Sequence, residues 1–209
     1  MNQEKKSNFI LAKLDELFPN PSIQLNFSSN FTCLVAVMLS AQCTDVSVNK
    51  VTDKLFDVAA TPREFVNLGE EKLKEIIRPC GFFNTKAKSI IGTARIILEK
   101  YRGEVPAAFE ELESLPGVGH KTASVLMGQC FNAPAFPVDT HIARLANRWN
   151  LEKSRDVKKI EARLKTLFSR EKWKKLHLQL ILYGKKFCPA RGHSLLKCPI
   201  CRKFSEGVE

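Results

Sequence analysis

Apolar residues recur at helical spacing through almost the whole chain, and this periodicity restricts the fold more than any other feature of the sequence. Residues 30–41 are apolar on all sides, which is typical of a buried helix. A longer pattern is expected to begin at Asn84 as its cap and to end before Gly103. Other helical patterns lie at about 9–17, 45–56, 62 onward, 73–77, 108–114, 120–131, 140–149, 156–168 and 170–187. Because no alternating segment with hairpin turns accompanies them, the sequence predicts an all-α fold.

The composition is typical of a globular protein of one or two domains. Hydrophobic residues make up 44% and charged residues 26% of the 209 residues, which excludes a disordered or fibrous chain. The longest apolar run, from Cys33 to Leu39, is far shorter than the roughly 20 residues that span a bilayer. The apolar patch after Phe9 is soon interrupted by Lys13, so we expect no signal peptide and no membrane partner, and we expect a cytoplasmic protein.

The net charge of +11 is concentrated near the C-terminus. Residues 1–150 carry a net charge of +1, whereas residues 151–209 carry +10. Such a basic surface usually faces a polyanion, most often a nucleic acid, although a solvated basic face without a partner is the alternative. Asn132, Pro134 and Pro137 interrupt the helical pattern just before this change in charge, so we expect a domain boundary there.

The segment Leu115-Pro116-Gly117-Val118-Gly119 joins two expected helices. Gly117 and Gly119 permit a positive φ and a close approach of another backbone. The helix that begins near His120 would present free N–H groups to the segment, which suits a phosphate. A plain tight turn explains the same residues, and the basic C-terminal part of the chain favours the phosphate.

Lys121 and Asp139 are candidates for chemistry. Lys121 falls in the first turn of a helix, where the positive end of the dipole disfavours the ammonium form, and an uncharged lysine is a nucleophile. An ordinary solvated lysine is the alternative. Asp139 is expected to cap the helix at 140–149, and hydrogen bonds from the helix keep its carboxylate ionised. Capping alone is the alternative for Asp139.

Together these motifs resemble a known family. The segment from Leu115 to Trp149, with its Leu-Pro-Gly-Val-Gly-x-Lys and Val-Asp-Thr-His motifs, resembles the helix-hairpin-helix DNA glycosylases. Three further segments are similar to the endonuclease III family in particular: Leu25-Asn-Phe-Ser-Ser, Leu39-Ser-Ala-Gln-Cys-Thr-Asp-Val-Ser-Val-Asn-Lys50 and Gly103-Glu-Val-Pro. The resemblance covers about residues 22–190.

The resemblance implies two helical lobes with a DNA-binding active-site cleft between them. Residues 23–132 would form a six-helix domain that carries the helix-hairpin-helix motif, and residues 1–22 with 133–209 would form the second domain. It also implies a base-excision repair enzyme, a bifunctional DNA N-glycosylase and abasic-site lyase. We expect a monomer whose partner is double-stranded DNA that contains oxidised pyrimidines or abasic sites.

Roles for individual residues follow from the same resemblance. Lys121 would attack the sugar C1′ as a nucleophile, release the base and form a Schiff base, after which β-elimination breaks the strand 3′ to the abasic site. Asp139 would assist Lys121. Gln42 would fill the gap left by the flipped base, and Phe82 and Phe83 would enter the duplex as an apolar wedge where the family has leucine. The hairpin residues would contact DNA: Leu115, Pro116, Gly117, Val118, Gly119 and His120, the last in place of the family's usual arginine.

The seven cysteines are an odd number, and we expect no disulfide framework. Four of them lie in apolar surroundings and are expected in the core: Cys33, Cys43, Cys80 and Cys130. The other three form a Cys-x9-Cys-x2-Cys cluster at Cys188, Cys198 and Cys201.

This cluster departs from the family pattern. The resemblance implies a [4Fe–4S] cluster held by Cys-x6-Cys-x2-Cys-x5-Cys, but Gly207 stands at the fourth position here. Clusters of this kind normally use four protein ligands. His193 lies inside the widened spacing and is a candidate fourth ligand, and three cysteines with one histidine also suit zinc. The sequence therefore leaves three outcomes open: an iron–sulfur cluster, zinc, or no metal.

Two other functions compete with the bifunctional enzyme. A mispaired-adenine glycosylase of the same superfamily characteristically lacks the hairpin lysine, so Lys121 argues against it. A DNA-binding module without catalysis would need neither Lys121 nor Asp139.

Overall fold

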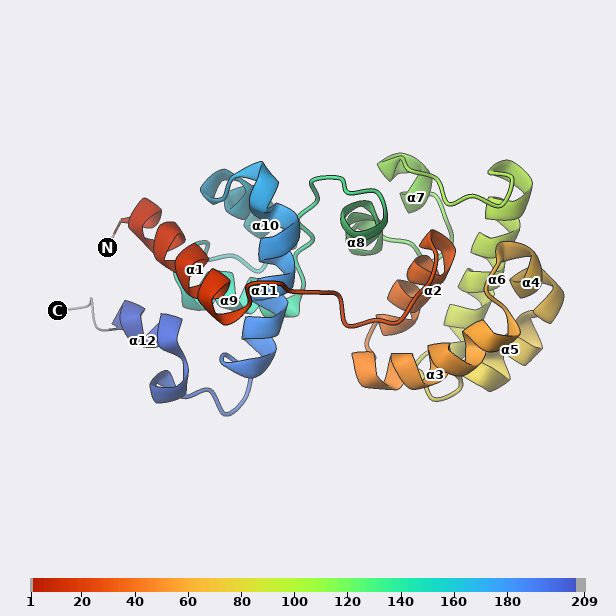
Figure 1. Ribbon diagram of the computed structural model, residues 1–209, viewed down its shortest axis with the longest axis horizontal. Coiled ribbons are helices and arrows are strands. Elements are labelled where there is room, and N and C mark those ends of the chain that lie inside the picture. The colour runs from red at the N-terminus through yellow and green to blue at the C-terminus, as the bar shows by residue number, and fades with distance from the viewer. Residues whose placement is uncertain (1, 206–209) are drawn as a thin grey trace. The chain divides into compact units, whose positions relative to one another are not determined.

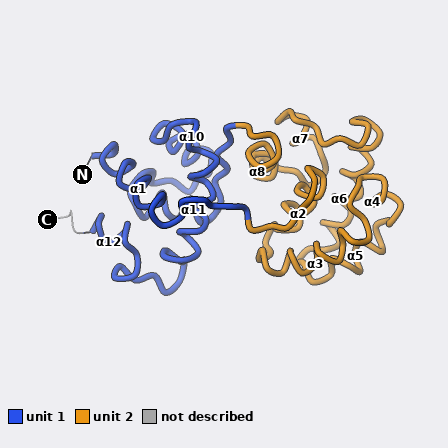
Figure 2. The backbone as a smooth tube through the Cα atoms, viewed as in Figure 1, with its two compact units in different colours: residues 1–23, 134–209 blue, residues 24–133 orange. Residues whose placement is uncertain are grey.

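The computed structural model describes residues 2–205, and within that range the chain is helical without any strand (Figure 1). The expectation of an all-α fold is confirmed. The chain divides into two compact units, one of residues 24–133 and the other of residues 1–23 with 134–209 (Figure 2). None of the helices in the described range is long and apolar enough to cross a membrane.

The unit of residues 24–133 is built around one buried helix. It contains α2 (Asn30–Ser40), α3 (Asp45–Val58), α4 (Pro62–Leu68), α5 (Glu70–Ile77), α6 (Phe83–Lys100), α7 (Phe109–Glu113) and α8 (His120–Cys130). Every residue from Phe31 to Leu39 is buried, as the apolar pattern of this segment predicts. Helix α2 packs against α3, α6 and α8, and α4 and α5 pack on α6 (Figure 1).

Side-chain caps fix where several of these helices begin. The Thr44 hydroxyl accepts a hydrogen bond from the N–H of Ser47 at the start of α3. Thr61 and Glu64 form a capping box at the start of α4, with Pro62 at the first helical position. Helix α6 begins at Phe83, with Phe82 as its N-cap, so the expectation of a cap at Asn84 is wrong.

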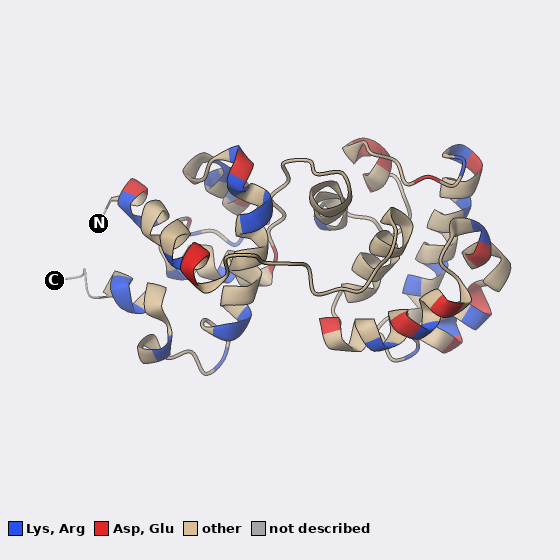
Figure 3. Cartoon of the chain, viewed as in Figure 1, with Lys and Arg blue, Asp and Glu red and all other residues tan. Residues whose placement is uncertain are grey.

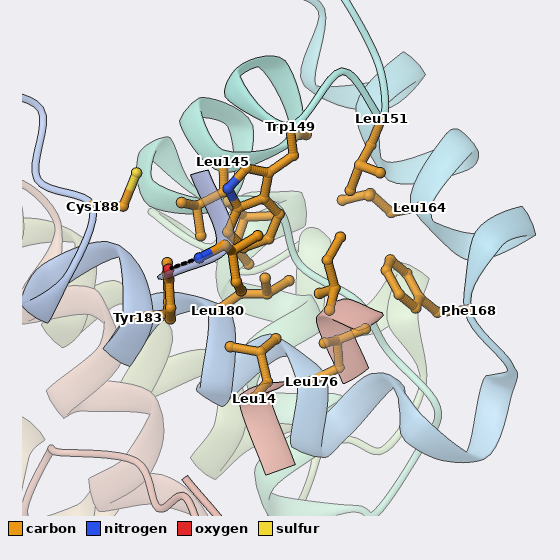
Figure 4. Packing of buried hydrophobic residues seen from close by; sticks show 14 of the residues in the cluster. Leu14, Leu145, Trp149, Leu151, Leu164, Phe168, Leu176, Leu180, Tyr183 and Cys188 are labelled. Carbon is orange, nitrogen blue, oxygen red and sulfur yellow. Dashed lines mark hydrogen bonds between the residues drawn. The ribbon is translucent and has the colours of Figure 1, made fainter. Parts of the chain in front are cut away.

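The other unit surrounds a separate apolar core. It contains α1 (Gln3–Leu17), α9 (Thr140–Arg148), α10 (Val157–Leu167), η1 (Arg170–Lys172), α11 (Trp173–Lys186), η2 (Leu195–Lys197) and α12 (Pro199–Ser205). Leu14 of α1, Trp149 after α9 and Leu180 of α11 are all buried in it (Figure 4). The N-terminal helix α1 packs in this unit, against α10 and α11.

The segment after α11 contains elements that the periodicity did not predict. Helices η2 and α12 are three and seven residues long, and Ile200 and Cys201 are the buried residues of α12. Cys188 and Cys198 are also buried. This segment packs through its cysteines and a few apolar side chains, which is why a helical pattern was not evident.

Candidate functional site

Two buried apolar side chains anchor the loop between α7 and α8. Leu115 and Val118 are buried, and the N–H of Val118 donates to the carbonyl of Leu115 at 3.1 Å. Gly117 and Gly119 are exposed and Pro116 is half-buried. Any contact of Leu115 or Val118 with a ligand must therefore come from the backbone, because their side chains fill the core.

Gly117 is required by its conformation and by its surroundings. Its φ is +75°, and a Cβ at this position would lie 2.8 Å from the Cβ of Ser89 on α6. The neighbouring Thr93 hydroxyl donates to the carbonyl of Pro116 at 2.9 Å. Thr93 thus holds the hairpin loop against α6, and Ser89 lies close to Gly117. Sequence reasoning missed both residues because their spacing marks only a helix face.

The N-terminus of α8 faces outward without a side-chain cap. Gly119 is the N-cap residue, so the helix has no side-chain cap. Such a terminus carries a partial positive charge that favours an anion. The His120 ring lies 2.8 Å, Nδ1 to Oε1, from Glu113 and packs on Phe109, so it connects the two helices of the hairpin.

Lys121 is the second residue of α8 and is exposed. Among the described residues its ammonium group makes no hydrogen bond and no ion pair. The side chain is therefore available to a ligand at the open end of the helix.

Gln42 and Phe82 lie at one pocket with Gly117. Its volume is about 210 Å³, and it is lined by Met38, Ala41, Gln42, Phe82, Thr85, Lys86, Ser89 and Gly117. Gln42 and Phe82 both have a positive φ, of 54° and 59°, which is uncommon for residues other than glycine. Phe82 is 66% exposed. Phe83 is half-buried and does not line this pocket.

A buried lysine holds the Gln42 turn in place. Lys86 is 8% exposed, and its Nζ donates to the carbonyls of Leu39 and Ala41, each at 2.8 Å. The ammonium group thereby satisfies carbonyls at the C-terminal end of α2, where the helix dipole favours a cation. No sequence pattern indicates this role, because Lys86 resembles the other polar residues of α6.

Asp139 caps α9, in the unit that does not contain Lys121. Its Oδ1 accepts a hydrogen bond from the N–H of Ile142 at 2.9 Å, and the residue is half-buried. The expected capping role is therefore present, and the carboxylate is held in one direction by the helix.

His141, two residues after Asp139, packs closely against Gly184 of α11. A Cβ at Gly184 of α11 would lie 3.0 Å from the Cβ of His141, so the glycine permits this close contact. Burial lowers the pKa of His141, while the charge of Asp139 opposes this shift. Arg144 Nη2 lies 3.0 Å from the His141 Nδ1, which suits a neutral imidazole that accepts the bond.

Cys188, His193, Cys198 and Cys201 come together after α11. Their ligand atoms all lie within 4.8 Å of one another. This group could bind a metal, and we refer to it as the Cys₃His group. Gly207, the other position considered for a fourth ligand, lies outside the described residues.

Each sulfur of the Cys₃His group meets a polar side chain. Arg148 Nη1 donates to Cys188 at 3.1 Å, Trp149 Nε1 donates to Cys201 at 3.3 Å, and the Tyr183 hydroxyl lies 3.2 Å from Cys198. Hydrogen bonds with the other two cysteines, and with Tyr183, hold the pKa of Cys198 well below its usual range. The sequence analysis missed these three partners, because they lie 15–52 residues from the cysteines.

Lysine and arginine side chains are frequent on α10, α11 and α12 (Figure 3). These helices belong to the part of the chain in which the sequence placed most of its excess positive charge. The basic character of this unit therefore comes from several helices rather than from one disordered tail.

Comparison with known proteins gives one consistent result. Residues 35–170 match the family model of the HhH-GPD superfamily of base excision DNA repair proteins. The chain is 46% identical to endonuclease III of Haemophilus influenzae over 212 aligned residues, which cover 100% of both chains. It is also similar to two solved structures at 35% identity. One is a non-covalent endonuclease III–DNA complex, with a TM-score of 0.93 and coverage of 99% and 98% of the two chains. The other is a trapped endonuclease III–DNA covalent intermediate, with a TM-score of 0.92 and full coverage of both chains.

Proposed function

This chain belongs to the endonuclease III family of the HhH-GPD superfamily, and on that premise we propose that it is a base-excision repair enzyme acting on double-stranded DNA. It is a DNA N-glycosylase that releases oxidised pyrimidines and a lyase that cleaves the strand at the abasic site. The observation that carries this function is the exposed Lys121 at an uncapped helix terminus, directly after the hairpin loop. We also propose that it works in the cytoplasm, with access to DNA.

Lys121 is the proposed nucleophile. Its uncharged amine attacks C1′ of the damaged nucleotide, and the C1′–N bond to the base breaks with its electron pair leaving on the base. Loss of the ring oxygen bond then gives a Schiff base between Nζ and C1′. Removal of a proton from C2′ and departure of the 3′ phosphate complete a β-elimination, which breaks the strand 3′ to the abasic sugar.

Asp139 is proposed to assist this chemistry as an ionised carboxylate. Its hydrogen bond from the α9 backbone supports the role, because a carboxylate that accepts a bond from a helix N-terminus keeps its direction. A carboxylate near the sugar stabilises the positive charge that develops at C1′ and can accept the proton of the attacking amine.

The hairpin and the pocket are proposed to hold the DNA. Backbone N–H groups of the loop and of the α8 terminus would bind a phosphate, with Leu115 and Val118 serving only through their backbone. Gln42 and Phe82 would enter the duplex, supported by their exposure and their shared pocket. Phe83 is proposed as a further DNA contact. His120 is proposed to contact DNA through its backbone, because the His120 ring is bonded to Glu113.

The [4Fe–4S] cluster that the family resemblance implies does not fit the Cys₃His group. In such a cluster each protein ligand binds a different iron, so the ligand atoms must surround a cube of metal and sulfide. Here the sulfurs of Cys188 and Cys201 are only 3.8 Å apart. The proposed reaction needs only an amine and a carboxylate.

Trapping with borohydride tests the proposed function. Borohydride added during reaction with abasic duplex DNA should reduce the Schiff base and leave a covalent protein–DNA adduct. Lys121→Gln should bind the DNA without trapping or nicking it, whereas Lys72→Gln, at an exposed lysine of α5, should behave as the native protein does. If the native protein binds DNA but is never trapped, the chain is a binding module. If Lys121→Gln still traps, the nucleophile is another residue.

A second variant separates the two roles of Asp139. Asparagine caps helices as well as aspartate, so Asp139→Asn should change the stability by less than about 0.5 kcal/mol. The loss of charge should slow base release by about 10²–10⁴-fold. Native rates in Asp139→Asn would mean that Asp139 is a cap alone.

A further inference from the structure

The Cys₃His group has the dimensions of a site for one metal ion. With zinc–sulfur bonds of about 2.3 Å, two sulfurs of a tetrahedral site lie about 3.8 Å apart, and a sulfur and a nitrogen lie about 3.6 Å apart. The distance between the sulfurs of Cys188 and Cys201 is 3.8 Å, and no two ligand atoms of the group are more than 4.8 Å apart. The four atoms therefore converge on a single point.

A ring nitrogen of His193 lies within 4.8 Å of the three sulfurs. The His193 Nε2 is buried and has no hydrogen-bond partner within residues 2–205. Cys188, Cys198 and Cys201 are also buried, at 0%, 0% and 7% exposed. A buried polar atom without a partner costs free energy, and a metal ion bound by the group removes that cost.

We propose that Cys188, His193, Cys198 and Cys201 bind one Zn²⁺ as a closed tetrahedral site, in place of the iron–sulfur cluster of the family. Four protein ligands leave no open position for water or substrate, which is the property of a structural rather than a catalytic zinc site. Three thiolates and a neutral imidazole with Zn²⁺ carry a net charge of −1. Cys198 and Cys201 have the two-residue separation that is common in zinc sites.

The surroundings of the group suit such a charge. Arg148 is bonded to the sulfur of Cys188 and also donates to the carbonyl of Pro189 at 2.8 Å. Trp149 donates to the sulfur of Cys201, and the Tyr183 hydroxyl lies 3.2 Å from the sulfur of Cys198 and accepts a bond from the N–H of Ile200 at 3.0 Å. Outer partners of this kind orient ligands and stabilise thiolates.

The proposed ion would hold the segment after α11 against the rest of its unit. Arg148 and Trp149 lie at the end of α9, and Tyr183 lies on α11, while the ligands themselves come from the segment after α11. Figure 4 shows Trp149, Tyr183 and Cys188. That segment has only a few buried apolar residues of its own. The zinc site would thus supply the stability that its short helices η2 and α12 lack.

Metal analysis tests the proposal independently of DNA repair activity. The full chain, produced with both iron and zinc available and purified without oxygen, should contain about one zinc per chain and no iron–sulfur absorbance. Replacement of zinc by Co²⁺ should give the visible bands of tetrahedral thiolate coordination. Four irons per chain, or a folded chain with no metal, would overturn the proposal.

Variants then test the ligand set. His193→Ala should weaken zinc binding by at least about 100-fold, because even outer-shell changes cost about 10–100-fold. His193→Cys should retain zinc with a shifted Co²⁺ spectrum, and Lys197→Ala, an exposed residue of the same segment, should match the native protein. Native zinc affinity in His193→Ala would remove His193 from the site. Since trapping at Lys121 is a separate measurement, failure of the zinc site and failure of the proposed function are distinguishable.

Discussion

Gly117→Ala is expected to destabilise the hairpin through two separate effects. An alanine with φ near +75° adopts a left-handed backbone conformation, which costs about 1–2 kcal/mol. Its Cβ would also lie 2.8 Å from the Cβ of Ser89 and 3.2 Å from the Cε of Met38, and overpacking of this kind costs about 1–3 kcal/mol. Together these effects predict a loss of about 2–5 kcal/mol in the free energy of unfolding.

Urea denaturation followed by circular dichroism measures this loss. Tryptophan fluorescence is unsuitable by itself, because Trp149 and Trp173 both lie outside the unit that carries the hairpin. Gly119→Ala is the matched control, since its added Cβ would meet no atom within 4 Å, and it should cost about 1 kcal/mol or less.

A double-mutant cycle with Ser89→Gly separates the two effects. Removing the Ser89 side chain should relieve the overpacking but leave the cost of the positive φ, giving a coupling of about 1–3 kcal/mol. If Gly117→Ala is as stable as Gly119→Ala and shows no coupling to position 89, the close packing of the hairpin loop on α6 is refuted.

Three further predictions concern other parts of the molecule. Lys86→Met should cost about 1–3 kcal/mol, because it leaves two carbonyls at the end of α2 without their donor; Lys88→Met, at an exposed position of the same helix, should cost little in the same denaturation assay. Burial lowers the pKa of His141 in the folded protein. As the pH falls below about 6.5, His141 is therefore protonated in the unfolded chain while it is still neutral in the folded chain. The stability that this neutral histidine contributes is therefore present above that pH and lost below it. Denaturation at several pH values should show that His141→Gln loses less free energy of unfolding on acidification than the native protein. An equal loss in both proteins would assign the pH dependence to other groups. Affinity for abasic duplex DNA should fall steeply with salt, measured by fluorescence anisotropy, and a flat dependence would exclude phosphate contacts by the basic unit.

Much of the fold follows from local sequence rules. Asp139 caps its helix as the sequence predicts, because an N-cap needs only its own side chain and the next turn. The apolar periodicity of α2 was enough to predict its burial. These features depend on neighbours within four residues, and the sequence shows those neighbours directly.

The start of α6 shows where local rules fail. Asn84 is a good capping residue, yet Phe82 is the N-cap in a left-handed conformation, next to the buried Lys86. Lys86 is bonded to carbonyls that lie 45 and 47 residues away in the sequence, and these bonds fix this part of the helix. No local sequence pattern predicts bonds between such distant residues.

The residues proposed for the candidate site also come from local motifs. The hairpin, Lys121, Asp139 and the three clustered cysteines are visible as motifs, because each is a short run of characteristic residues. The contact between Gly117 and Ser89, and the partners that Arg148, Trp149 and Tyr183 provide to the sulfurs, depend on packing between distant segments. No local sequence pattern shows such contacts.

The central claim is that the amine of Lys121 forms the covalent bond to the abasic sugar. The most direct measurement is peptide mapping by mass spectrometry of the adduct that borohydride traps on abasic DNA. The account predicts that the added sugar mass is on Lys121. An adduct on another lysine or on the terminal amine, with Lys121 unmodified, would contradict it.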